Sequence, residues 1–305
     1  MSRVGSPEPD PSLIGHVAKP PFARLPDPVR LFATRAERFR WLADGHPLAP
    51  YLNFLADLSA AQSAIQEGLP EPEPVPADAL SRAQAHKMPP LDRGKFVPDA
   101  AFTATFERLL AAADTMNMPD VARAALDRLK AADAAAREAM IQNVLADSIP
   151  VEAIAEHVFV AAPLQVHFTR LAARLNAKSL QDVGDGACPS CGGAPSASLV
   201  EDWQGAGGVR YCACALCGTN WNYVRARCTL CGSTKSIRFQ EVEGSGGTVK
   251  AETCDECRGY VKVLYRQRDN ALDPIADDVA TLGLDLLVKE LGFRRGAVNP
   301  FLVGY

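Results

Sequence analysis

Nine cysteines are the side chains of this sequence best suited to chemistry, and all of them lie between residues 188 and 257 of the 305. Eight form Cys-x-x-Cys pairs. Two thiolates separated by two residues in a tight turn can reach one metal ion about 2.3 Å away, and the amides of the turn point at the sulfurs. The four pairs are Cys188 and Cys191, Cys214 and Cys217, Cys228 and Cys231, and Cys254 and Cys257.

The spacing of the pairs repeats. Adding 40 to each cysteine number of the first two pairs gives a cysteine of the last two, which indicates a tandem duplication of one metal-binding unit. Gly192, Gly218 and Gly232 directly follow three of the pairs, and glycine tolerates the positive φ that such turns need. Arg258 follows the fourth pair, so we expect its turn to differ slightly.

We therefore predict two sites, each made of four thiolates. Interleaved pairing, or one four-iron cluster, is the alternative. Iron and zinc both accept tetrahedral sulfur, so the spacing does not distinguish them. A zinc ion would serve folding, whereas an iron ion could also change its oxidation state. Site 1 would consist of Cys188, Cys191, Cys214 and Cys217, and site 2 of Cys228, Cys231, Cys254 and Cys257.

Cys212 is the ninth cysteine and falls outside the repeat, because Glu252 stands 40 positions later. In a strand it would point to the same face as Cys214, within a few ångströms of a metal-bound sulfur. One interpretation is a small buried apolar side chain. The other is a spare redox thiol that exchanges into site 1 or forms a disulfide when the metal is lost.

The part of the chain before these cysteines predicts helices. It is rich in Ala and Leu, with apolar residues at spacings of three and four. We expect two helices within 25–62, broken near 45–50, and about four within 102–175, where Pro119, Pro150 and Pro163 are breaks or first-turn residues. Proline alternates with acidic residues in 68–80, which predicts an extended, exposed linker.

After residue 187 the sequence predicts short strands, because Gly, Cys, aromatic and β-branched residues dominate. A helix should follow over 273–292, with Asp273 as N-cap, Pro274 in first position and Gly292 as C-cap, and it could pack on either domain. The expected strands are 209–214, 221–228, 236–242 and 260–266. The expected domains are a helical domain 1–185, metal modules 186–226 and 227–270, and a helix with its tail 271–305.

The overall composition argues against two classes of protein. A net charge of -4 and a pI near 5.8 are atypical of proteins that grip a polyanion. The sequence has no run of about 18 apolar residues that could span a bilayer, and its first residues lack the order of a signal peptide. We expect a cytoplasmic protein, where clustered thiols stay reduced and available to metals.

No set of residues in the sequence predicts catalysis, and we assign no catalytic residue. The histidines are scattered and lack the His-Glu-x-x-His pattern of zinc enzymes, so we interpret them as satisfied surface or core residues. Asp277 and Asp278 resemble paired acids, but the first turn of a helix favours acidic residues through its dipole. The five histidines are His16, His46, His86, His157 and His167.

The sequence resembles the FdhE-type formate dehydrogenase accessory proteins of bacteria. The four spaced cysteine pairs followed by the motifs ADD and NPFL are specific to this family, whereas residues 64–100 contribute little to the resemblance. The stretches that carry the resemblance are LFATRAERFRWLADGHPLAPYLNFLADLSAAQ, CPSCGGAP, RYCACALCGTNWNYVRARCTLCG, ETCDECRGYVKVLY and ADDVATLGLDLLVKELGFRRGAVNPFL.

This resemblance implies a fold and a role. The fold is an all-helical N-terminal domain followed by two tandem rubredoxin-like or zinc-ribbon-like modules and a C-terminal helix, holding two four-thiolate metal ions, with iron favoured over zinc. The role is cytoplasmic maturation of respiratory formate dehydrogenases, which are exported folded by the twin-arginine route. The accessory protein would bind the immature catalytic subunit before export. The resemblance implies neither a substrate nor a turnover reaction, and the charge and hydropathy given above argue against nucleic acid and membrane insertion.

Two other classes of function stay open at this point. One is a thiol or iron redox protein or sensor acting on the same enzyme through the iron or Cys212. The other is a zinc-ribbon protein that binds nucleic acid through a stripe such as Arg225, Arg227 and Arg238. The tail residues Arg294, Arg295, Asn299, Pro300 and Phe301 suit a partner or the protein's own other domain, and we favour intramolecular docking.

Overall fold

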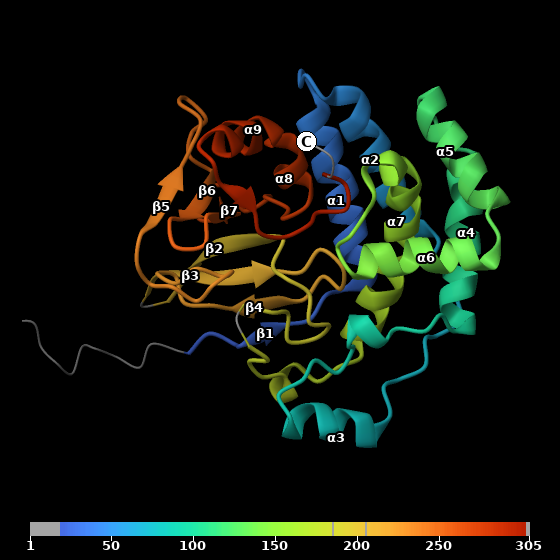
Figure 1. The fold of residues 1–305 in the computed structure, drawn as a ribbon, viewed down its shortest axis with the longest axis horizontal. Coiled ribbons are helices and arrows are strands. Elements are labelled where there is room, and N and C mark those ends of the chain that lie inside the picture. Colours follow the sequence, from blue (N-terminus) through green and yellow to red (C-terminus); the bar gives the residue numbers. More distant parts are fainter. Residues whose placement is uncertain (1–18, 185, 205, 303–305) are drawn as a thin grey trace, which may run out of the picture.

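The computed structural model describes residues 19–184, 186–204 and 206–302. A helical region lies beside a sheet that carries the cysteines, as Figure 1 shows. The predicted fold class, helical first and then sheet-rich with two four-cysteine clusters, is confirmed. The first residues, which we judged not to be a signal peptide, lie outside the described residues, as does His16.

The helical region contains the predicted helices. Asp27 begins the first of them by accepting a hydrogen bond from the Arg30 amide, and Asp99 does the same for Phe102 in the fourth. The helices are α1 (Pro28–Ala43), α2 (Ala49–Ala64), α3 (Ala77–Ala85), α4 (Ala100–Asp114), α5 (Asp120–Ala131), α6 (Ala134–Leu145) and α7 (Ile154–Ala173), with short 3-10 turns at Arg93–Lys95, Val151–Ala153 and Ala177–Ser179.

Two expectations for this region need correction. Pro163 lies inside α7 and does not break it, because nearly every side chain of α7 is buried and packing offsets the lost backbone hydrogen bond. The linker is mostly exposed, as predicted, but Leu69 and Pro72 are buried and its last residues, from Ala77, belong to α3. Arg170 and Arg174 hold it down by binding Glu71, each with a nitrogen 3.1 Å from a carboxylate oxygen.

The strands form one mixed sheet in the order β1-β4-β3-β2-β7-β6-β5, with β8 beside β7. The two cysteine repeats therefore share a sheet, because β2 of the first pairs in parallel with β7 of the second. β5 falls within a predicted stretch and β3, β4 and β7 overlap predicted ones, although β4 covers only the start of 221–228. β1, β2, β6 and β8 were not predicted. The strands are β1 (Ala23–Arg24), β2 (Ala197–Trp203), β3 (Ala206–Ala213), β4 (Asn220–Asn222), β5 (Ile237–Gln240), β6 (Val249–Cys254), β7 (Gly259–Tyr265) and β8 (Arg294–Arg295).

The C-terminal helix is broken where we predicted it to be continuous, into α8 (Ala276–Ala280) and α9 (Leu282–Glu290). Lys262 of β7 causes the break by donating to the carbonyl oxygens of Asp278 (2.8 Å) and Thr281 (3.0 Å), which a continuous helix would use itself. Asp273 does cap the start, since its carboxylate accepts from two backbone amides there, but the helix begins at Ala276 and not at Pro274.

Buried ion pairs join the C-terminal segment to both regions. Arg38 of α1 binds Asp277 with N–O distances of 2.7 and 3.0 Å, and Lys262 and Arg295 bind Asp278. Asp277 and Asp278 lie in the first turn of a helix, as predicted, and both are also buried in ion pairs, which the sequence did not indicate. The tail docks on its own chain as predicted, with Asn299 donating to Asp278 at 2.9 Å.

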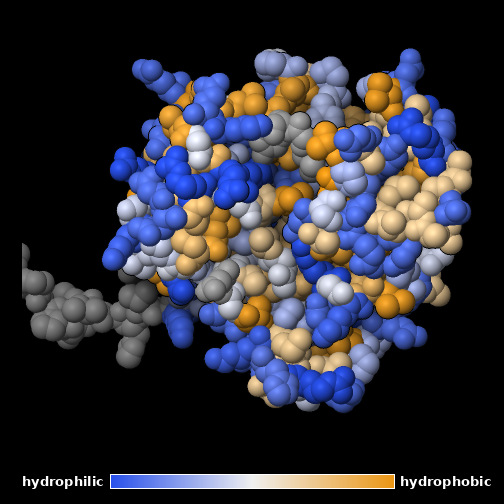
Figure 2. Space-filling model, viewed as in Figure 1, coloured by the Kyte–Doolittle hydropathy of each residue, from blue (hydrophilic) through white to orange (hydrophobic). Residues whose placement is uncertain are grey.

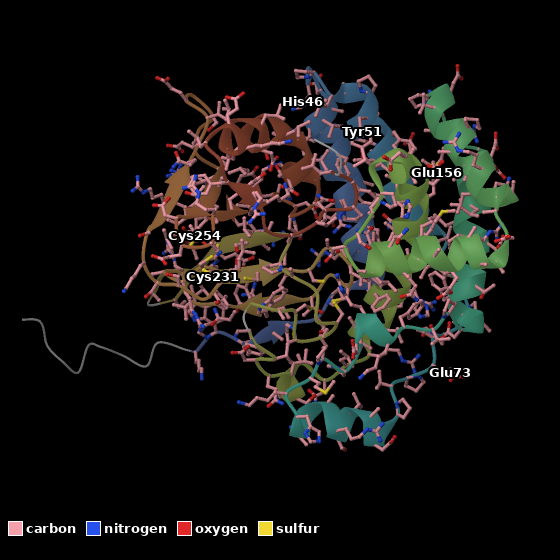
Figure 3. All side chains as sticks on the ribbon, in the orientation of Figure 1. His46, Tyr51, Glu73, Glu156, Cys231 and Cys254 are labelled. Carbon is pink, nitrogen blue, oxygen red and sulfur yellow. The ribbon has the colours of Figure 1, made fainter. Side chains whose placement is uncertain are left out.

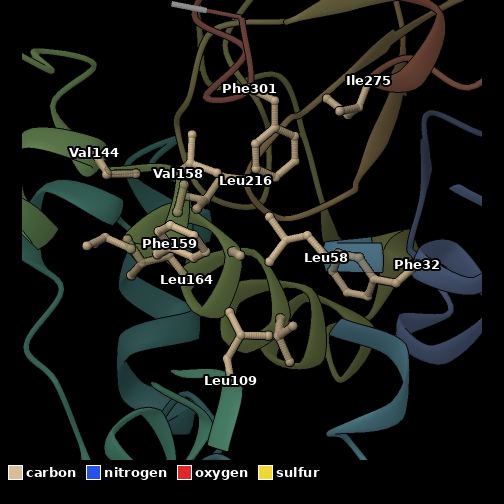
Figure 4. Close-up of a cluster of buried hydrophobic side chains, with 14 of the residues drawn as sticks. Phe32, Leu58, Leu109, Val144, Val158, Phe159, Leu164, Leu216, Ile275 and Phe301 are labelled. Carbon is tan, nitrogen blue, oxygen red and sulfur yellow. The ribbon is translucent and has the colours of Figure 1, made fainter. Parts of the chain in front are cut away.

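One apolar core unites the helices, the first cysteine repeat and the tail. Leu216 stands between two cysteines of site 1, yet its side chain lies among helical residues such as Leu164 (Figure 4). Ile275 and Phe301 of the C-terminal segment join the same cluster. Site 1 is therefore part of the main core, whereas a smaller second core lies between the sheet and α9.

Candidate metal centres

The structure gathers the eight paired cysteines into two clusters, and in each the four sulfurs lie within 4.8 Å of one another. Site 1 joins the first pair with the second, and site 2 the third with the fourth, so the pairs are not interleaved. Figure 3 shows Cys231 and Cys254 side by side in site 2. The closest Sγ–Sγ distances are 3.6 Å for Cys188–Cys217, 3.5 Å for Cys191–Cys214, 3.9 Å for Cys228–Cys257 and 3.8 Å for Cys231–Cys254.

These distances fit a tetrahedral ion. Metal–sulfur bonds of about 2.3 Å give a tetrahedron whose edges are about 3.8 Å. A disulfide would instead bring two sulfurs to about 2.05 Å. Four soft sulfur donors suit iron or zinc, and the arrangement does not distinguish the two.

The turns that carry the sulfurs have one shared conformation. Gly192 donates its amide hydrogen to the Cys188 carbonyl at 2.8 Å, and Gly218 and Gly232 repeat this bond to Cys214 and Cys228. Their φ angles are 81°, 70° and 72°. Arg258 takes the same place in the fourth turn with φ of 55°, so the conformation is kept although the residue type differs.

Clustering changes the acidity of the thiols. Burial raises the pKa of Cys188 well above its ordinary value, while hydrogen bonds from the Cys188, Cys191 and Cys217 thiols lower the pKa of Cys214 well below it. In site 2, burial raises the pKa of Cys228 to about 12, and the backbone amide of Ser233 lowers the pKa of Cys231. Within each cluster the thiols hydrogen-bond to one another, so loss of a proton from one of them is favoured by the others.

The two sites differ in solvent access. All four cysteines of site 1 are buried. In site 2, Cys228 and Cys254 are buried, Cys257 is half-buried and Cys231 is exposed. A duplicated sequence unit has therefore produced two environments, and only site 2 offers a sulfur to solvent directly.

The helical region covers site 1 through bonds to the backbone of its turns. The Leu91 amide donates to the Ser190 carbonyl at 2.8 Å, and the Arg93 amide donates to that of Cys191 at 3.3 Å. From α7, the Gln165 side chain donates to the carbonyl of Ala215 at 2.8 Å. These residues could not be predicted from the sequence, since they lie far from the cysteines along the chain and make ordinary polar contacts.

Arg93 also brings a positive charge to site 1. Its guanidinium binds Asp147 and interacts electrostatically with the sulfurs of Cys191 and Cys214. A tetrahedral site of four thiolates and one divalent ion would carry a net negative charge, which Arg93 would offset only in part, because the Asp147 carboxylate also interacts with Cys214.

Cys212 belongs to neither cluster. Its buried sulfur lies 3.8 Å from the Ser198 hydroxyl, which in turn accepts a hydrogen bond from Arg210. Burial raises the pKa of Cys212 to about 11, so the thiol is a weak nucleophile at neutral pH. The interpretation as a small buried side chain fits this setting, and the spare-thiol role stays a prediction.

The other candidate residues serve the fold. His46 and His157 bind the carbonyls of Ala280 and Ala153. His167 is buried, but its Nδ1 atom has no hydrogen-bond partner among the described residues, so the satisfied role expected of it is wrong. The arginines of the expected nucleic-acid stripe are engaged within the chain: Arg225 binds Gly207, Arg227 binds Gly232 and Arg238 pairs with Asp255.

A helical domain joined to a duplicated four-cysteine knuckle unit defines the class of protein, and comparison with known sequences gives the family. Profiles described as FdhE, N-terminal; FdhE, central domain; and FdhE, C-terminal domain match residues 20–185, 187–225 and 226–302. The chain belongs to the FdhE family, as the resemblance of its cysteine motifs and tail implied.

Individual relatives agree over nearly the whole chain. The Protein FdhE homolog of Rhizobium meliloti (strain 1021) is 46% identical over 304 residues, which cover 99% of each chain. That of Stutzerimonas stutzeri (strain A1501) is 36% identical over 93% of each chain. The crystal structure of the FdhE protein from Pseudomonas aeruginosa matches with a TM-score of 0.83 and 32% identity, covering 93% of this chain and 99% of that one.

No helix within the described ranges combines the length and the apolar character needed to cross a bilayer.

Proposed function

We propose that this protein is a non-catalytic accessory protein that binds the immature catalytic subunit of a respiratory formate dehydrogenase in the cytoplasm, before export. The observation that carries the proposal is the pair of four-sulfur clusters in a chain of the FdhE family. We further propose that each cluster holds one metal ion, with iron favoured over zinc. The ligands are the eight cysteines of sites 1 and 2.

A bound metal ion would join the two Cys-x-x-Cys turns of its site through four metal–sulfur bonds, and iron would also allow reversible one-electron oxidation and reduction. The chain's own residues do the rest. Arg93, paired with Asp147, would offset part of the charge of site 1, while Gln165 and the Leu91 amide fix the turns of that site against the helices. We propose that the chain is divided into a helical domain 1–185, modules 186–226 and 227–270, and a terminal segment 271–305. The client would bind to surfaces of these parts that the metal-loaded sites hold in place.

Co-purification tests this function. The wild-type protein, expressed with a formate dehydrogenase, should capture the catalytic subunit. Cys214→Ser and Cys228→Ser each open one site and should weaken capture at least tenfold, with metal content falling from two ions to one per chain. Normal capture and normal enzyme maturation with both sites open would refute a metal-dependent interaction.

A redox protein or sensor acting on the same enzyme is the second candidate. The exposed sulfur of Cys231 favours it, because a solvent-facing metal site can exchange electrons or react with oxidants. A redox titration of the metal-loaded protein separates the two functions. A reversible redox couple in the biological range of potentials would support the second candidate. If no such couple is found, client binding is the only one of the two functions that stands.

A further inference from the structure

A groove of about 640 Å³ opens where three helices and the C-terminal segment meet, away from both cysteine clusters. Tyr51 and Phe54 of α2 form one side, Val121 of α5 another, and the start of α7 a third. Leu302, the last described residue, lies at its edge. In the space-filling view, moderately apolar residues form a patch among charged ones over neighbouring α4, α5 and α6 (Figure 2).

The walls of the groove are mostly apolar and partly open to solvent. Val121 is 73% exposed and Val151 is 67% exposed. The hydroxyl of Tyr51 is already engaged, since it donates to the carbonyl of Phe301 at 2.7 Å. An occupant would therefore gain mainly apolar contact from most of this surface.

Three charged residues line the groove, Arg128, Glu152 and Glu156, and Glu156 is the buried one. It lies in the first turn of α7 (Figure 3), the residue is 8% exposed, and its Oε1 accepts from Arg128 Nε at 2.6 Å. Oε2 is buried and has no hydrogen-bond partner among the described residues. Leaving a charged acceptor without a donor is unfavourable, so an occupant that brings a cation would remove this deficit.

The form of the occupant follows from the walls. They are helices whose backbone groups are bonded internally, so an extended peptide would find no free strand edge there. A helix satisfies its own backbone and can place apolar side chains, spaced by three and four residues, into a groove of this kind. A basic side chain on the same face could reach Glu156.

We propose that this groove binds a helical segment of a protein client, with apolar residues in the groove and an Arg or Lys side chain paired with the carboxylate of Glu156. The proposal rests on the proposed function, because the client is taken to be the formate dehydrogenase catalytic subunit. It adds a docking surface and the chemistry that surface selects.

The experiment uses the full-length, metal-loaded protein and two probes: the purified catalytic subunit, and overlapping 20-residue peptides that cover its sequence. Val121→Asp puts a charge on the groove rim, and Val97→Asp does the same at an equally exposed valine outside the groove. Glu156→Gln removes the buried charge, and Glu152→Gln removes an exposed charge from the same groove. Circular dichroism and metal content check that every variant folds.

The proposal expects Val121→Asp and Glu156→Gln to weaken binding of the subunit at least tenfold, with Val97→Asp and Glu152→Gln within twofold of wild type. Peptides that bind should be apolar and contain an Arg or Lys. When that Arg or Lys is replaced by Gln, the peptide should bind wild type and the Glu156→Gln variant with equal affinity. Unchanged binding in all four variants would overturn the groove and leave the proposed function standing.

The identity of the client can also be wrong while the groove is right. If the whole subunit does not bind wild type but basic apolar peptides bind in a Val121-dependent way, the groove stands and the proposed client is wrong. If neither probe binds, both claims are wrong. Loss of binding in Val97→Asp with Val121→Asp unaffected would place the client on the other face and overturn the groove.

Discussion

At the scale of single residues, the four knuckle turns show how one conformation is held in different surroundings. Gly218 and Gly232 have nearly the same positive φ, but they meet different neighbours. A Cβ atom on Gly218 would lie 2.8 Å from Leu31 Cδ2 and 3.2 Å from Pro26 Cβ, whereas on Gly232 it would meet only the Arg227 guanidinium, at 2.9 Å. The long Arg227 side chain can shift, at the cost of its hydrogen bond to the Gly232 carbonyl, whereas Leu31 is packed against the main core.

We therefore expect Gly218→Ala to destabilise the protein by about 1 kcal/mol or more beyond the cost of Gly232→Ala, which should be about 1–2 kcal/mol from the left-handed conformation alone. Denaturant unfolding of both metal-loaded variants measures the difference. Equal losses would mean that contact between Gly218 and α1 contributes nothing to stability.

His167 gives the stability a pH dependence. It is buried among Phe96, Phe102 and Phe168, and burial lowers its pKa to about 4. The unfolded chain, with an ordinary histidine, binds the proton first as the pH falls, so wild type loses about 2 kcal/mol between pH 7 and pH 5 from this group. His167→Phe keeps an aromatic ring at this position but cannot bind the proton. Between pH 7 and pH 5 its free energy of unfolding should therefore fall by about 2 kcal/mol less than that of wild type.

Unfolding free energies of wild type and His167→Phe at the two pH values test this expectation. Both proteins carry the same metal sites, so metal loss in acid cancels in the comparison. Parallel pH dependence of the two proteins would show that His167 is as easily protonated in the folded state as in the unfolded one.

At the scale of elements, the two sites should behave differently because one is inside the core. Cys231 of site 2 is exposed, whereas every sulfur of site 1 lies beneath the helices. A chelator should remove the metal of site 2 at least tenfold faster. Alkylation mapped by mass spectrometry checks this: Cys231 and Cys257 should be labelled before Cys188 and Cys191, and simultaneous labelling would contradict it.

The buried ion pair between α1 and the C-terminal segment should contribute strongly to the stability of the protein. Arg38 is 8% exposed and binds Asp277 through two nitrogens. Arg38→Met leaves that carboxylate buried without its partner, which should cost about 3–5 kcal/mol. Arg40→Met removes an exposed pair with Asp57 from the same helix and should cost less than about 0.5 kcal/mol. Thermal unfolding of both variants measures the contrast.

The sequence predicted elements where periodicity or spacing was strong. The 40-residue register assigned all eight paired cysteines to the clusters in which they lie. It could not show that β2 and β7 join the repeats, because this pairing is between residues more than 60 positions apart. The break after Ala280 was also invisible, since it depends on Lys262 reaching across from the sheet.

At the scale of the whole molecule, the metal sites and the helical domain form one structure. Leu216 of site 1 packs in the helical core, and Arg38 ties α1 to the C-terminal segment. The groove beside Glu156 is built from these same joined parts, since its walls include α2, α7 and Phe301. Loss of the metal at site 1 should therefore loosen surfaces remote from the cysteines.

The affinity of the purified protein for the formate dehydrogenase catalytic subunit, measured with both sites loaded and with both opened by Cys214→Ser and Cys228→Ser, tests the central claim most directly. We predict tight binding by the loaded protein, with two metal ions per chain, and binding at least tenfold weaker by the double variant. Equal affinity of the two proteins for the subunit would contradict a metal-dependent accessory function.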